Sequence, residues 1–379
     1  MIRCDGLRLA LFTDTFSPQM NGVTRTLERL SEAIELSGGE VRMFTVESPG
    51  AQTDPRVVRF SAREFWAYKE LRLAWPSQGK VQRALDEFAP TLVHSATEFG
   101  VGIAGRRAAA AMGIPFVSSY HTNFVEYARH YRLGLLSPFG WSYLRWFHNA
   151  AVRTFCPTQS IALQLRQMGF RDLRLWSRGV DTTRFNPSFR SEQLRAQMGA
   201  NPDTLVVAYV GRLAPEKGID VAVEAIRIAD GKCPERILFC CVGDGPCERE
   251  VRRSVPHSAW MPGRLVGDAL SRAYASADLF IFPSATDTFG NVLLEAMASG
   301  LPVLGADVGP TREIIGDKRG WLVPSGDAAA FAELIVGLVD DRDALRAARV
   351  HALAHAANSS WERVWDALLY EYLAVHKSR

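Results

Sequence analysis

Two carboxylates with a defined spacing are the clearest sign of chemistry in this sequence. Residues 283–303 place Asp287 and Glu295 with seven residues between them, around a short loop that ends at Gly290. Gly290 lets the backbone approach a ligand closely, and the predicted helix after it can offer N–H groups to an anion. Glu295 follows Asn291 by four residues, so both lie on one helix face. This pattern suits a sugar diphosphate, with amides on phosphate, one acid on sugar hydroxyls and the other on a ribose. A buried strand-turn-helix with Asp287 as its cap is the alternative.

Two cations follow the predicted strand Leu205–Val210. Arg212 and Lys217 stand in the loop after this strand, and the carboxyl ends of strands are where α/β folds bind ligands. Two positive charges there could neutralise a diphosphate without a metal ion. The alternative is that both are ordinary surface charges.

The sequence offers no convincing metal site. Asp341 and Asp343 have the spacing of a metal clamp, but they stand at the end of a late helical region, which is typical of a solvated charge run. Four of the six cysteines fall between residues 233 and 247, and their spacing matches no common zinc pattern. Cys240 and Cys241 belong to a predicted buried strand. We therefore expect neither a metal ion nor another cofactor.

The first half of the chain contributes two further candidates. Gly22 stands in a turn at the first strand-helix junction and could bring backbone amides to phosphates, although an ordinary turn glycine would look the same. His121 follows the predicted strand Pro115–Ser118, so it lies at a strand's carboxyl end among polar and aromatic neighbours. That position favours a role in a site. His94, at the end of another strand, is more typical of a core or cleft-lining residue.

The elements that position these residues fall into two halves with the same pattern. Short apolar runs alternate with helical patterns, which indicates parallel α/β layers. We expect one Rossmann-like domain over residues 1–178 and a second over 179–360, with an aromatic-rich helix over 361–379 that packs back on the first. The predicted strands cover residues 7–12, 41–46, 92–94, 115–118, 153–156, 205–210, 237–242, 279–282 and 301–304.

Two Rossmann-like halves are also found in dehydrogenases. Such an enzyme should carry G-x-G-x-x-G directly after a strand, with an acidic residue about 20 positions later. Residues 13–22, after the first predicted strand, contain one glycine, and Val242–Pro246 offers two glycines and then a proline. The sequence therefore argues against an NAD-binding protein.

The bulk composition is that of a soluble globular protein. The chain has 379 residues, of which 47% are hydrophobic and 22% charged, enough for two domains with their own cores. It shows no secretory signal, and no apolar stretch approaches the roughly 20 residues of a spanning helix. We expect a cytoplasmic protein, either free or peripheral on the inner face of the membrane.

Basic and aromatic residues gather in the first half. Residues 1–190 carry 24 Lys and Arg against 16 Asp and Glu, whereas residues 191–379 carry 20 against 25. Residues 65–75 mix bulky rings with cations and follow three arginines (Arg56, Arg59 and Arg63). This mixture favours contact with an anionic membrane surface. A folded aromatic core with a solvated basic rim is the alternative, and no motif supports a nucleic-acid partner.

Taken in order, these landmarks resemble the family 4 retaining glycosyltransferases of the GT-B fold. The matching segments are Asn21-Gly22, Ser119-Tyr-His121, Arg178-Gly-Val-Asp181, Gly211 to Lys217, Val242 to Pro246 and Asp287-Thr-Phe-Gly with Glu295. Asp287 stands where this family more often has Glu, which leaves the donor sugar open. The narrower likeness is to sulfoquinovosyl-diacylglycerol synthases and glycolipid mannosyltransferases. It is carried by Ser-Tyr-His-Thr with Tyr127 and Tyr131, and by residues 174–181 with Phe185-Asn-Pro.

The resemblance implies an α/β protein of GT-B fold, with two Rossmann-like domains and a cleft between them. It makes Tyr127 and Tyr131 the candidate acceptor contacts. The catalytic candidates that it implies are His121, Arg212, Lys217 and Asp287. The implied donor-binding residues are Gly22, Arg212, Lys217, Gly243, Arg264, Leu265, Asp287, Phe289, Gly290, Asn291 and Glu295.

In this family the cations would hold the donor diphosphate, Glu295 the ribose and Asp287 the donor sugar, while the base would rest near Arg264 and Leu265. We therefore expect a metal-independent retaining hexosyltransferase that uses a UDP- or GDP-linked sugar and an acceptor hydroxyl, most readily that of a membrane lipid. A soluble enzyme acting on a sugar or small metabolite, a GT-B epimerase and a binding protein without turnover are the alternatives.

Overall fold

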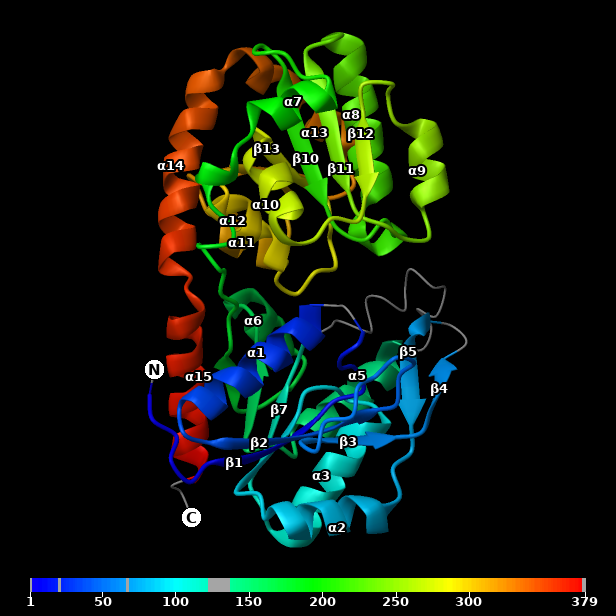
Figure 1. Cartoon of the computed structure of the whole chain (residues 1–379), viewed down its shortest axis with the longest axis vertical. Helices are drawn as coiled ribbons and strands as arrows, with labels where there is room; N and C mark the ends of the chain where they lie inside the picture. Colours follow the sequence, from blue (N-terminus) through cyan, green and yellow to red (C-terminus); the bar gives the residue numbers. More distant parts are fainter. Residues whose placement is uncertain (1, 20–21, 66–67, 122–136, 377–379) are drawn as a thin grey trace. The chain divides into compact units, whose positions relative to one another are not determined.

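The computed structural model describes residues 2–19, 22–65, 68–121 and 137–376 (Figure 1). The chain forms two compact units. Unit 1 contains residues 1–177 together with residues 362–379, and unit 2 contains residues 178–361. Each unit is described by itself.

Unit 1 is built on a parallel sheet in the strand order β3-β2-β1-β6-β7-β8-β9. A separate antiparallel pair, β4 and β5, follows β3 in the chain. The strands are β1 (Arg8–Phe12), β2 (Glu40–Val46), β3 (Val57–Phe60), β4 (Ala62–Phe65), β5 (Tyr68–Ala74), β6 (Leu92–Ser95), β7 (Phe116–Ser119), β8 (Arg153–Cys156) and β9 (Leu173–Leu175). The helices are α1 (Gly22–Leu36), α2 (Gln78–Phe88), α3 (Gly100–Met112), α5 (Ser137–His148), α6 (Gln159–Gln167) and α15 (Trp361–His376).

The central strands β1, β6 and β7 of unit 1 are almost entirely buried, as parallel strands covered by helices are. Phe12 on β1 and Phe44 on β2 are buried and stack with ring centroids 4.3 Å apart. Helix α3 packs on β1 and β6 at close range, since a Cβ added at Gly105 would lie 2.6 Å from the Phe12 ring. This close packing fixes the start of α3 against the carboxyl end of β1.

Unit 2 repeats the design with a parallel sheet in the order β12-β11-β10-β13-β14-β15. The strands are β10 (Leu205–Val210), β11 (Ile237–Val242), β12 (Trp260–Gly263), β13 (Leu279–Phe282), β14 (Val303–Ala306) and β15 (Gly320–Val323). The helices include α7 (Glu192–Met198), α8 (Ile219–Lys232), α9 (Glu248–Ser254), α10 (Gly267–Ala275), α11 (Asn291–Ala298), α12 (Gly309–Ile315), α13 (Ala328–Asp340) and α14 (Arg342–Asn358). Two short 3-10 helices, η2 (Pro187–Phe189) and η3 (Pro215–Lys217), precede α7 and α8.

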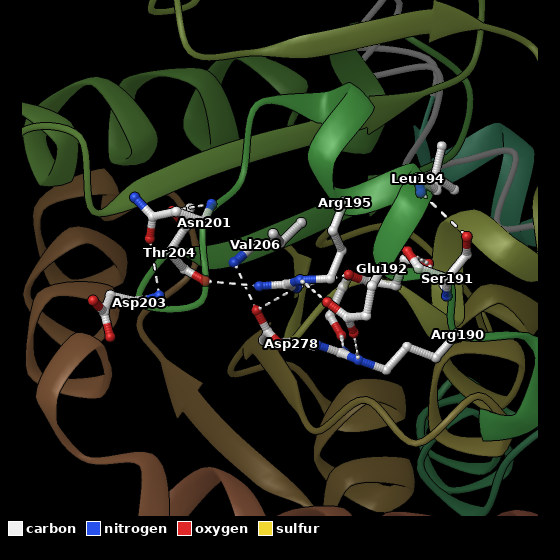
Figure 2. Close-up of polar contacts among 12 residues, drawn as sticks. Arg190, Ser191, Glu192, Leu194, Arg195, Asn201, Asp203, Thr204, Val206 and Asp278 are labelled. Atoms are coloured by element: carbon white, nitrogen blue, oxygen red, sulfur yellow. Dashed lines mark hydrogen bonds and ion pairs between the residues drawn. The ribbon is translucent and has the colours of Figure 1, made fainter.

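A buried arginine ties α7 to the start of β10 and β13, as Figure 2 shows. Arg195 donates to the Asp278 carboxylate at 2.9 Å and to the Thr204 carbonyl at 3.0 Å. Asp278 also accepts the backbone N–H of Val206 at 2.9 Å. The charge of Arg195 is thus paired and hydrogen-bonded, as a buried cation requires. The contacts set the register at the amino end of the two strands whose carboxyl ends carry the candidate site.

The edge strands are where the sequence prediction was incomplete. Strands β3, β12 and β15 are mostly half-buried, so they lack the continuous apolar run of a central strand. The predicted strand over residues 301–304 is β14, which begins at Val303 because Pro302 has no N–H for the ladder. Within the described parts of the chain, no helix combines the length and apolar character that a bilayer crossing requires.

Candidate functional site

The candidate donor residues lie where the unit 2 sheet reverses its winding. From β10 the chain moves outward to β11 and β12, and then returns to the other side of β10 for β13, β14 and β15. Ligands of open α/β sheets bind at such a switch point, outside the carboxyl ends of the strands. The loops after β10 and β13 contain Arg212, Lys217, Asp287 and Gly290. The topology therefore brings together the two groups of residues that the sequence had marked separately.

An ion pair joins these two loops. The Nζ atom of Lys217, at the end of η3, lies 2.5 Å from Oδ1 of Asp287. Their side chains are 24% and 18% exposed, so both groups are partly sheltered and still reach the surface. The next residue, Gly218, has φ = +65°, and a Cβ there would lie 2.9 Å from the Pro283 carbonyl oxygen. The loops consequently touch along their backbones, and this fixes the lysine beside the aspartate.

Asp287 is therefore not the helix cap that the sequence left open as an alternative. The N-cap of α11 is Gly290, at φ = +83°, which has no side chain to accept a hydrogen bond. A Cβ at Gly290 would lie 2.9 Å from the Phe282 ring, so the tight loop needs glycine on steric grounds as well. The side chain of Phe289 is buried in the hydrophobic core, which leaves its backbone for a ligand.

Glu295 lies one turn into α11, after Asn291. Its Oε2 atom accepts a hydrogen bond from the Tyr274 hydroxyl at 3.0 Å. Tyr274 is fully buried on α10, where it packs against Phe280 and Phe185. A rigid ring thus orients the carboxylate, and sequence reasoning did not single out Tyr274.

Glu216 is a second residue that sequence reasoning left unassigned. Its side chain is buried next to Arg212, with Oε1 3.3 Å from Nη1 of the arginine. The other oxygen, Oε2, has no hydrogen-bond partner among the residues that the structure describes. The backbone carbonyl of Glu216 accepts from Ser284 at 3.3 Å and from Thr286 at 2.8 Å. Glu216 therefore connects Arg212 to the loop after β13, and its place between Arg212 and Lys217 was the available signal.

The remaining donor candidates follow the strands on the other side of β10. Gly243, directly after β11, has φ = +146°, and a Cβ there would lie 1.9 Å from the Gly211 carbonyl oxygen. Only glycine fits this contact, which packs the β10 and β11 loops together. Arg264 and Leu265 follow β12 at the sheet edge, where Arg264 is exposed and Leu265 packs on the core.

The unit 1 candidates lie at the carboxyl ends of β1 and β7. Gly22 is the first residue of α1, and His121 follows β7. The Nε2 atom of His121 lies 2.8 Å from Oγ of Ser119, and its ring packs edge-on against Trp176 with centroids 5.1 Å apart. Tyr127 and Tyr131, the acceptor candidates, lie outside the described residues.

Unit 1 also has buried acids that the sequence analysis did not single out. Asp14, directly after β1, accepts from the Thr97 hydroxyl at 2.7 Å and from the N–H groups of Val101 and Gly102 in α3. Burial raises the pKa of Asp14 from 3.8 to about 6. Within the described ranges no three His, Cys, Asp or Glu side chains come together as metal ligands.

Comparison with known proteins shows the family of the chain. Residues 20–184 match the family described as Glycosyltransferase Family 4, and residues 204–341 match Glycosyl transferases group 1. A GDP-mannose-dependent alpha-mannosyltransferase of Mycobacterium tuberculosis is 33% identical over 99% of this chain and 98% of its own length. The sulfoquinovosyl transferase SQD2 of Arabidopsis thaliana is also 33% identical, over 89% of this chain and 67% of its own length.

Solved structures show the same fold at lower identity. A sucrose-phosphate synthase from Thermosynechococcus elongatus superimposes with a TM-score of 0.77 at 20% identity, over 98% of this chain and all of that one. Anabaena HepE in complex with UDP and glucose gives a TM-score of 0.76, also at 20% identity, over 97% of this chain and 99% of that one. The chain therefore belongs to the family 4 glycosyltransferases, enzymes of the GT-B fold.

Proposed function

We propose that this enzyme transfers a hexose from a nucleoside diphosphate sugar to a lipid hydroxyl and retains the α configuration at the sugar. The observation that carries the proposal is the pairing of Lys217 with Asp287 at the switch point of the unit 2 sheet, next to Arg212. Two cations and one acid then meet where a diphosphate and its sugar would be bound.

Each side chain of this site has a chemical role. Arg212 and Lys217 bind the diphosphate oxygens and stabilise the negative charge that grows on them during transfer. Asp287 orients Lys217 and accepts hydrogen bonds from sugar hydroxyls. Glu295, oriented by Tyr274, accepts hydrogen bonds from the ribose. Gly243, Gly290 and the loop after β12 contribute backbone groups to the phosphates and the base.

The reaction needs no protein nucleophile in this scheme. The bond between the anomeric carbon and the phosphate oxygen breaks, and its electron pair leaves with the diphosphate. The acceptor oxygen attacks from the same face, and its proton passes to the departing phosphate oxygen. Because the two cations stabilise that oxygen, the scheme requires no metal ion.

GDP-mannose is the donor that we propose to test first. Three relatives named GDP-mannose-dependent alpha-mannosyltransferases match 97–99% of this chain at 30–33% identity. UDP-linked sugars, the other donors that the sequence analysis expects, are the second group to test. Arg264 and Leu265, the candidate base contacts, are the place where the two nucleotides would be distinguished.

Thermal shift of the purified protein with EDTA present tests the donor site. A ligand at about 100 times its Kd should stabilise the protein by about 2.7 kcal/mol. We expect GDP-mannose or one UDP-sugar to raise the Tm of the wild type and not of Lys217→Ala. A shift that appears only with added Mg²⁺ would contradict metal independence. Conversion of the donor to another nucleotide sugar without an acceptor would favour the epimerase.

A lipid acceptor is supported by exposed rings on unit 1. Trp75 and Phe139 are 77% and 76% exposed, on the half of the chain with excess positive charge. Arg56 and Arg59, two of the three arginines that the sequence suggested for membrane contact, have partners within unit 1. Arg56 pairs with Glu35 and Asp54 at 2.9 Å each, and Arg59 donates to backbone carbonyls. The exposed rings are therefore the better targets for a membrane test.

We expect Trp75→Ser with Phe139→Ser to reduce co-sedimentation with anionic liposomes several-fold, since interfacial binding scales with the apolar area buried. Leu36→Ser, at a residue 73% exposed on α1, is the matched control. Unchanged sedimentation of the double variant, with full activity on a water-soluble acceptor, would favour the soluble glycosyltransferase instead.

A further inference from the structure

A chain of hydrogen bonds connects the last helix of unit 1 to His121. The Tyr372 hydroxyl, on α15, lies 2.7 Å from Nδ1 of His94 at the middle of β6. The Nε2 atom of His94 lies 2.9 Å from Oγ of Ser119, at the end of β7. That same oxygen lies 2.8 Å from Nε2 of His121. Two imidazoles and two hydroxyls thus alternate from the core to a candidate catalytic residue.

The inner side chains of this hydrogen-bond series are buried. Tyr372 and His94 are fully buried, and Ser119 is 1% exposed. Burial lowers the pKa of His94 to about 3, so its ring is neutral at physiological pH. A neutral imidazole has one N–H donor and one acceptor nitrogen, and each nitrogen of His94 has one partner here.

The buried tyrosine fixes the direction of every bond. His94 is the one hydrogen-bond partner of the Tyr372 hydroxyl among the residues that the structure describes. If that hydroxyl accepted from His94, its own proton would be buried without an acceptor, which is costly. Tyr372 therefore donates to Nδ1 of His94, and Nε2–H of His94 donates to Ser119. The Ser119 hydroxyl then donates to Nε2 of His121.

We propose that Tyr372, His94 and Ser119 are positioning residues that hold His121 as its Nδ1–H tautomer, with that N–H as a hydrogen-bond donor toward the substrate. The proposal rests on the proposed glycosyl transfer, for which the family resemblance makes His121 a catalytic candidate, although the tautomer itself is a property of unit 1. Trp176 supports the arrangement, because its ring packs against both imidazoles, at 5.8 Å from His94 and 5.1 Å from His121.

A fixed tautomer matters because the two forms of a histidine present opposite groups at the same place. The Nδ1–H form offers a donor, which suits a sugar hydroxyl oxygen or a phosphate oxygen. The other form would offer a lone pair at that position and repel the same oxygen. If His121 is held as the Nδ1–H tautomer before the substrate binds, no tautomer change is needed during the reaction.

Two-bond ¹H–¹⁵N spectra of histidine-labelled protein test the tautomer without any substrate. The signals of His94 and His121 are assigned with His94→Gln and His121→Gln among the eight histidines. We expect the Nδ1–H pattern for His121 and the Nε2–H pattern for His94. The Nε2–H pattern for His121 in the wild type would overturn the proposal.

Tyr372→Phe removes the hydroxyl that sets the direction. We expect a mixture of His121 tautomers and a fall in kcat on the order of 10-fold, with the KM for the donor changed less than twofold. The matched control is Tyr370→Phe, an exposed tyrosine on the same helix, which should leave both readouts at the wild-type value. Ser119→Ala removes the hydroxyl between His94 and His121 with little change in volume. This variant replaces Tyr372→Phe in the test if Tyr372→Phe does not fold.

The two readouts separate this proposal from the proposed function. One outcome is that no nucleotide sugar binds, but the tautomers are as expected and respond to Tyr372→Phe. The proposed function then fails, and the control of the His121 tautomer by Tyr372, His94 and Ser119 is confirmed. The other outcome is that turnover is confirmed and Tyr372→Phe mixes the tautomers without lowering kcat. The hydrogen bonds are then only structural, and the positioning role of Tyr372, His94 and Ser119 is overturned.

Discussion

Each of the two sheets has one pair of neighbouring strands at which the winding reverses: β1 with β6 in unit 1, and β10 with β13 in unit 2. Both switch points have a buried carboxylate just after the first strand of the pair. In unit 1 it is Asp14, and in unit 2 it is Glu216. The same topology thus offers two places with the same general potential for binding a ligand.

The partners of these two acids differ. Asp14 is bound by Thr97 and by the first N–H groups of α3, so the positive end of that helix already has a carboxylate from its own unit. Glu216 instead pairs with a cation, Arg212, while the neighbouring Lys217 pairs with the less buried Asp287. Cations oriented by acids favour a diphosphate site at the unit 2 switch point, whereas the acid of unit 1 is already bound to a helix.

Removing Lys217 has the largest expected effect at the unit 2 switch point. We expect Lys217→Ala to lower kcat by on the order of 10³, since it removes charge stabilisation at the leaving diphosphate. The fold should be retained, because Lys217 is surface-accessible and its ion pair contributes little to stability. Lys232→Ala, at the exposed end of α8, is the control for both kcat and Tm. Near-normal turnover of Lys217→Ala would refute the assignment of the donor site.

The structural role of Asp14 can be tested by the pH dependence of stability. Its pKa is raised to about 6 in the folded protein, mainly by burial and further by the nearby charge of Glu98. The folded state therefore keeps the proton at pH values where the unfolded state has released it. As the pH rises from about 4 to 6, this group lowers the free energy of unfolding by ~3 kcal/mol at most.

Asp14→Asn should remove this decrease in the free energy of unfolding with rising pH, because an amide does not titrate. We would follow urea unfolding between pH 4 and pH 7 in the wild type, in Asp14→Asn and in the exposed control Asp5→Asn. If the free energy of unfolding of Asp14→Asn changed with pH as it does in the wild type, Asp14 would not titrate in this range. A loss of turnover with unchanged stability would mean that the unit 1 switch point is not merely structural.

How much could be predicted from the sequence follows from the same two regions. The central strands were recognisable because parallel strands covered on both faces read as unbroken apolar runs. The loops after β10 and β13 were recognisable because glycines and charges follow such runs directly. Their contact, Lys217 with Asp287, was not predictable, since 70 residues separate them and only the strand order makes them neighbours.

Long-range partners are what the sequence could not supply elsewhere either. The sequence analysis did not single out Asp14, because its acceptor role depends on α3, 87 residues later. Tyr372 was one residue of the predicted aromatic-rich helix, and its bond to His94 spans 278 positions. Local patterns predict which element a residue belongs to. The three-dimensional packing decides whether its polar group faces a ligand or another side chain.

The buried glutamate gives the smallest and sharpest test of the comparison. In Glu216→Gln the backbone bonds to Ser284 and Thr286 remain, and only the charge beside Arg212 is lost. If Glu216 orients the arginine, kcat should fall about 10-fold, or ~1.4 kcal/mol. The Tm should hold or rise, because an incompletely paired buried charge is removed. Glu224→Gln, an exposed acid on α8, is the matched control. Unchanged kcat would mean that the cations of unit 2 need no buried acid. Glu216 and Asp14 would then share only their place at a switch point of the sheet.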